Sequence, residues 1–135
     1  MYINILGNRN FIKNESKIIS LVKKAENNFD SDKYLTSYNL SGVFYRTATF
    51  YFNNKQYIKA EKYYKKTYNE LGLLQKHFFG KQLKHIVQLG IANSLFSQNM
   101  RNSANEIYIE IINDIDKENK EEMKQIREQY LGSNK

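Results

Sequence analysis

The chain has 135 residues, a formal net charge of +7 and an isoelectric point near 9.4, and it contains neither cysteine nor proline. These values predict a single domain, exclude disulfides, zinc–thiolate sites and cysteine nucleophiles, and leave no proline to interrupt long helices. The first residues lack the basic and apolar segments of a signal peptide, and no run approaches the roughly 20 apolar residues of a membrane span, so we expect a cytoplasmic protein without a membrane partner.

Apolar residues recur at steps of three and four along most of the chain, whereas no stretch alternates with a period of two. This spacing is typical of amphipathic helices and predicts an all-α fold without a sheet. Polar clusters between the apolar stripes, such as the capping sequence DSD and the turn-like NNK, mark where one helix ends and the next begins. The expected helices cover residues 11–27, 32–53, 56–75, 78–98 and a segment that begins after Arg101.

The end of the chain has a different character. Residues 117–131 are rich in charged side chains but keep apolar residues, including Met123 and Ile126, on one side. This pattern predicts a C-terminal helix that caps the end of the domain.

Two parts of the sequence match when one is shifted by 44 residues. In both parts a small residue in one helix is followed by an alanine and then a tyrosine in the next helix. The matched positions are Phe44, Thr47, Ala48, Tyr51, Ala60, Tyr64 and Thr67 in the first part, and Gln88, Ile91, Ala92, Leu95, Ala104, Tyr108 and Ile111 in the second. We therefore expect the four alanines to be buried where helices cross.

This arrangement resembles the tetratricopeptide repeat, a helix-turn-helix unit of about 34 residues. The resemblance implies antiparallel helical hairpins stacked as a short right-handed solenoid in one domain over residues 1–135. Repeat-like units would lie at about 41–75 and 85–116, with a possible preceding half-repeat at 11–27. The longer spacing, Gln88 in place of a large apolar residue and the missing proline depart from the family pattern. A generic antiparallel helical bundle is the alternative.

In tetratricopeptide proteins the first helix of each repeat lines a concave groove that binds peptides. By this resemblance Asn93 would pair with the backbone of an extended peptide, and Arg46 would hold a carboxylate. The alternatives are a solvated helix position for Asn93 and a packing role for Tyr45 and Phe52. The candidate peptide-binding residues are Tyr45, Arg46, Thr49, Phe52, Asn53, Leu89, Asn93, Phe96 and Ser97.

No pattern in the sequence predicts an enzyme. His77 and His85 are eight residues apart, whereas two metal ligands on a helix favour a spacing of three or four. We therefore expect no catalytic, metal-binding or cofactor-binding residues. Lysines and tyrosines alternate over residues 55–68, which is typical of a solvated face whose lysine stems cover aromatic rings. Nucleic acid is accordingly not expected as a direct partner.

The expected function is binding of a peptide or of a partner protein. Long, degenerate repeats with asparagine in the groove helix, together with the Lys/Asn/Ile/Tyr-rich composition, resemble the sensor domains of Gram-positive peptide-pheromone receptors of the Rap, Rgg and PlcR group. This resemblance implies the sensing part of a quorum-sensing or transcriptional regulator. A structural scaffold for protein–protein assembly is the alternative, followed by a basic nucleic-acid-binding helical protein. The chain would be either a fragment of a longer regulator or a homodimer that covers an exposed end.

Overall fold

The computed structural model describes residues 2–27, 33–73 and 78–131, and every element in these ranges is a helix. The prediction of an all-α fold is therefore confirmed for the described residues. None of the described helices is both long enough and apolar enough to cross a membrane. The elements are α1 (Tyr2–Asn27), α2 (Lys33–Asn53), α3 (Tyr57–Glu70), the short 3₁₀ helix η1 (Leu71–Leu73), α4 (Phe78–Ser97) and α5 (Arg101–Leu131).

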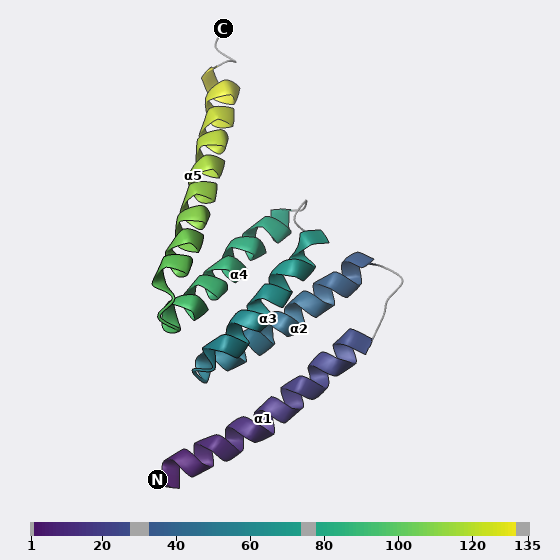
Figure 1. Cartoon of the computed structure of the whole chain (residues 1–135). Helices are drawn as coiled ribbons and strands as arrows, with labels where there is room; N and C mark the ends of the chain where they lie inside the picture. The colour runs from purple at the N-terminus through teal and green to yellow at the C-terminus, as the bar shows by residue number, and fades with distance from the viewer. Residues whose placement is uncertain (1, 28–32, 74–77, 132–135) are drawn as a thin grey trace.

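Each helix packs mainly against its neighbours in the chain. Figure 1 shows α2, α3 and α4 side by side, with α1 next to α2 and α5 next to α4. The C-terminal half of α5 continues past the other helices (Figure 1). The described side chains of residues 117–129 are all exposed, so this half of the helix projects from the packed part of the molecule.

Three helices differ from those that the sequence predicts. The helix predicted over 56–75 is α-helical only to Glu70 and continues as η1 to Leu73, and residues 74 and 75 lie outside the described residues. α1 begins at Tyr2 rather than at residue 11. Asn14 and Ser16, which resemble a helix start, are exposed positions within this continuous helix, where their side chains point to solvent. The sequence also predicts a separate capping helix over residues 117–131, whereas the structure continues α5 through them without a break. Neither glycine nor proline is present there to end the helix.

The hairpins α2–α3 and α4–α5 share the same turn. Lys55 and Asn99, which are 44 residues apart, both adopt the left-handed backbone conformation, with φ angles of 61° and 65°. Five backbone hydrogen bonds around the first turn recur at the equivalent positions of the second, with lengths between 2.9 and 3.2 Å. The 44-residue shift in the sequence therefore corresponds to a repeated turn geometry.

The four alanines of the repeated pattern are fully buried. Ala48, Ala60, Ala92 and Ala104 have no exposed surface, which confirms that prediction. Because an alanine side chain is small, the helices can approach each other closely at these positions.

An aromatic cluster joins the first three helices. The ring of Tyr51 is stacked on that of Tyr63, with 5.7 Å between centroids, and meets the ring of Phe11 at 6.4 Å in an edge arrangement. Phe11 is also stacked on Phe50 at 5.5 Å. The hydroxyl of Tyr51 donates a hydrogen bond of 2.8 Å to the Glu15 carboxylate. These contacts fasten α1 to α2 and α2 to α3.

Lysine side chains cover two of these rings from the outside. The Lys59 ammonium lies 5.3 Å from the centroid of Tyr51, and those of Lys62 and Lys66 lie 5.8 and 5.4 Å from that of Tyr63. Such contacts contribute about 0.5–1 kcal/mol each at exposed sites. The interpretation of these lysines as covers for tyrosine rings is confirmed for this part of α3.

Gln88 is buried in the core, and its side-chain carbonyl oxygen accepts no hydrogen bond from a described residue. Its side chain is 5% exposed, and its Oε1 atom has no hydrogen-bond partner among the described residues. The equivalent residue of the first hairpin is Phe44, which is apolar. A buried acceptor without a partner lowers stability, because it loses its hydrogen bonds to water on folding.

We expect Gln88→Leu to raise the free energy of unfolding by about 1 kcal/mol, because it removes this buried acceptor and keeps a side chain of similar size. Urea unfolding of the variant and the parent chain measures the difference. Gln125→Leu, on the exposed face of α5, is the control and should leave the core unchanged. An unchanged or lower stability of Gln88→Leu would contradict the expectation.

Candidate binding groove

An open groove lies between α2 and α4 and is also lined by α3 and η1. Its volume is about 480 Å³, within the range of about 300–1,000 Å³ that is typical of ligand sites. The side chains from the later elements are Thr67, Leu71, Leu83 and Val87. The lining residues from α2 are Tyr38, Asn39, Ser41, Gly42, Val43, Tyr45 and Arg46.

The groove combines an apolar floor with one cationic group at its edge. Val43 and Leu83, from α2 and α4, are partly buried and offer apolar surface to the groove, whereas Leu71 and Val87 are almost completely buried. Arg46 is exposed and forms no ion pair with any described residue. A guanidinium in this position can bind a carboxylate through two parallel hydrogen bonds, while the floor receives an apolar side chain.

Tyr45 and Arg46 are the two predicted site residues that line this groove. The sequence interpretation missed the residues one and two turns earlier, of which Tyr38 and Gly42 are examples. These residues precede Tyr45 by seven and three positions, a helical spacing that identifies the same face. The groove therefore lies nearer to the N-terminus of α2 than expected.

Thr49 and Asn93 hydrogen bond to tyrosines of the helix that follows. The Asn93 Oδ1 atom accepts a hydrogen bond from the hydroxyl of Tyr108, and the hydroxyls of Thr49 and Tyr64 lie 3.3 Å apart. The two pairs are equivalent under the 44-residue shift. Both residues thus link the two helices of their own hairpin, and the Asn93 carbonyl is occupied within the chain.

Phe52 and Asn53 lie at the C-terminal end of α2, away from the groove. The ring of Phe52 is partly buried and meets that of Tyr57 at 5.3 Å in an edge arrangement. Asn53 is exposed at the last position of the helix. Phe52 therefore packs against the start of α3.

The remaining predicted residues lie on α4 and do not line the groove. Leu89, Phe96 and Ser97 are exposed. The guanidinium of Arg101, at the start of α5, lies 5.5 Å from the centroid of the Phe96 ring. These side chains form a separate surface at α4.

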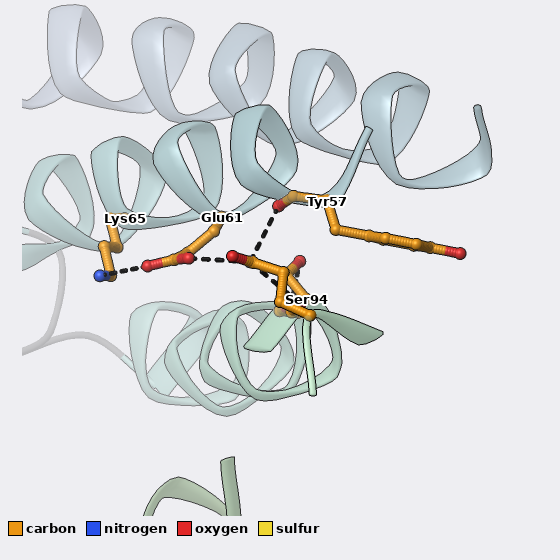
Figure 2. A network of polar contacts seen from close by, with 6 residues as sticks. Tyr57, Glu61, Lys65 and Ser94 are labelled. Carbon is orange, nitrogen blue, oxygen red and sulfur yellow. Dashed lines mark hydrogen bonds and ion pairs between the residues drawn. The ribbon is translucent and has the colours of Figure 1, made fainter. Parts of the chain in front are cut away.

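A polar network joins α3, in the first hairpin, to the C-terminal end of α4, in the second hairpin (Figure 2). The Glu61 carboxylate accepts hydrogen bonds from Lys65 at 2.6 Å and from Gln98 at 2.9 Å, and the Gln98 amide also reaches the backbone carbonyls of Ser94 and Tyr57. Burial by itself raises the pKa of Glu61, but the hydrogen bonds from Lys65 and Gln98 outweigh it, so the pKa lies below its ordinary value. The ionised carboxylate therefore holds the two helices together.

The described residues contain no group of three His, Asp or Glu side chains that is close enough to bind a metal ion. His77 lies outside the described residues, and His85 Nε2 lies 3.8 Å from the Asp114 carboxylate.

No protein-family model matches the chain, no curated protein is significantly similar to it, and no solved structure matches it.

Proposed function

We propose that this chain binds an extended peptide, or a segment of a partner protein, in the groove between α2 and α4. The bound segment places an apolar side chain over Val43 and Leu83 and a carboxylate beside Arg46. The chain then serves as the sensing part of a regulator, a role that rests on the resemblance to the peptide-pheromone receptors.

The groove supplies the main support for this proposal. It joins apolar side chains from η1 and α4 to a cationic group on α2 that has no ion-pair partner among the described residues. Ligand sites are typically concave and mostly apolar, with few polar groups that fix orientation. An acidic and partly apolar peptide matches this combination.

Further support comes from the two hairpins with equivalent turns. In stacked helical hairpins the first helices of successive hairpins face the same side, and an extended segment can bind along that side. The proposal assigns α2 and α4 to this role, as the tetratricopeptide resemblance implies.

The test begins with a displayed library of random heptapeptides selected against the purified chain. The enriched sequences, made as fluorescent synthetic peptides, are then titrated by anisotropy. Gly42→Trp should abolish binding, because a side chain at Gly42 meets no atom within 4 Å at its Cβ and therefore fills the groove without a clash. Arg46→Gln should weaken binding of acidic peptides by about tenfold.

Lys117→Gln, which removes one positive charge from the exposed part of α5, is the matched control and should bind as the parent does. Thermal melts of all variants should remain close to that of the parent, since the altered side chains are exposed. A library without enriched peptides, or peptides that bind Gly42→Trp as tightly as the parent, would refute the proposal.

A further inference from the structure

α5 carries a stripe of apolar side chains that is open to solvent and extends into the projecting half of the helix. Ile112, Ile115, Met123 and Ile126 are 62, 42, 54 and 42% exposed. With 3.6 residues per turn, these four positions fall within a sector of about 80° around the helix. Asn119 lies in the same sector. The stripe therefore consists of two apolar pairs on one face of the helix, Ile112 with Ile115 and Met123 with Ile126, and Asn119 lies between them.

The repeat of the hairpins identifies this stripe as an uncovered contact surface. α4 packs on the first hairpin, on the face of α3 that includes Tyr64, whose ring lies against Gly90. η1 continues this face at Leu71, which is 1% exposed. The shift of 44 carries Leu71 to Ile115. In the described part of the chain no further helix covers the equivalent face of α5.

The charges around the stripe favour a partner with the same balance of charge. Residues 117–128 contain four Lys or Arg and four Glu, so their formal charges cancel, whereas the whole chain carries +7. A strongly acidic or strongly basic partner would gain little from such a segment. A second copy of the same segment matches it in both apolar and charged positions.

We propose that α5 pairs in parallel with α5 of a second copy to form a two-stranded coiled coil. Placing Met123 at heptad position a and Ile126 at position d puts Glu122 at g and Arg127 at e. Parallel pairing brings Glu122 of one copy beside Arg127 of the second copy, as g and e positions do in parallel dimers.

The same heptad argues against antiparallel pairing. In that orientation e positions face e positions, so Lys120 and Arg127 of the two copies would lie together and repel each other. Asn119 falls at a d position and Asp116 at an a position. These polar layers lower the affinity of the pair, because the two Asp116 carboxylates would face each other in the parallel dimer and repel. The expected association is consequently reversible and depends on concentration.

Sedimentation equilibrium of the full chain over a range of concentrations tests the pairing. We expect a monomer–dimer equilibrium for the parent, and an association constant at least about tenfold lower for Ile126→Glu, a loss of about 1.4 kcal/mol. Gln125→Glu adds the same charge one position away, at about 100° around the helix, and should associate as the parent does. A parent chain that stays monomeric, or equal association of Ile126→Glu, would overturn the proposal.

A charge exchange tests the parallel orientation. Glu122→Arg and Arg127→Glu should each weaken association, because each places like charges side by side in the dimer. The double variant restores opposite charges between the copies and should recover most of the lost association. If the double variant associates no better than the single variants, the parallel arrangement is wrong. Circular dichroism of each variant verifies that α5 remains helical.

Discussion

Tyr51→Ala is expected to lower the free energy of unfolding by about 3–5 kcal/mol, the range for loss of a large aromatic side chain from a core. Tyr51 is 2% exposed and contacts rings from α1, α2 and α3, so its removal leaves a cavity at the junction of three helices. Urea unfolding followed by circular dichroism measures the loss. A loss below about 1 kcal/mol would show that the surrounding helices collapse into the space.

Tyr51→Phe is the control, because it keeps the ring and removes only the hydrogen bond to Glu15. The hydrogen bond from Tyr51, followed by that from Lys59, holds the pKa of Glu15 below its ordinary value of 4.5. The ionised Glu15 carboxylate therefore stabilises the fold fully above pH 4.5. This stabilisation is lost as the pH falls through the lower pKa that Glu15 has in the folded state. At neutral pH the free energy of unfolding of Tyr51→Phe should be about 1–2 kcal/mol below that of the parent. On acidification the variant should lose less stability than the parent does. An acid response equal to that of the parent would exclude Glu15 as its source.

Gly90→Ala is expected to destabilise the chain by about 1–3 kcal/mol, although alanine normally favours a helix interior over glycine. A Cβ atom at Gly90 would lie 2.8 Å from two ring carbons of Tyr64. The Tyr64 ring is 6% exposed and meets the Tyr45 ring at 5.9 Å, so it has little room to move. Differential scanning calorimetry of the variant measures the change.

Gly42→Ala provides the matched comparison for Gly90→Ala. Gly42 also lies within a helix, but a Cβ atom there would meet nothing within 4 Å. We therefore expect Gly42→Ala to stabilise the chain by about 0.5–1 kcal/mol through helix propensity alone. If both variants were stabilised to the same degree, the contact between Tyr64 and Gly90 would not limit the approach of α3 and α4.

Of the binding residues that the sequence predicts, only Tyr45 and Arg46 line the groove. Periodicity identified the helices α2 and α4 and one face of α2, which was sufficient to include Tyr45 and Arg46. The positions of Thr49 and Asn93 depend on tyrosines 15 residues further along the chain. Such contacts form only when the second helix of each hairpin folds back, and spacing within a single helix does not encode them.

The sequence by itself determined the helical fold, the two matched hairpins and the burial of the four alanines, because helical periodicity and small residues at crossings are local properties. The tertiary structure alone decided where the groove opens and which side of α5 stays bare. The groove depends on how η1 and α4 pack beside α2, and the close approach at Gly90 depends on the Tyr64 ring of another helix. The projection of α5 likewise follows from the packing of the 20-residue α4 against only part of the 31-residue α5, a relation between two helices that neither sequence segment contains.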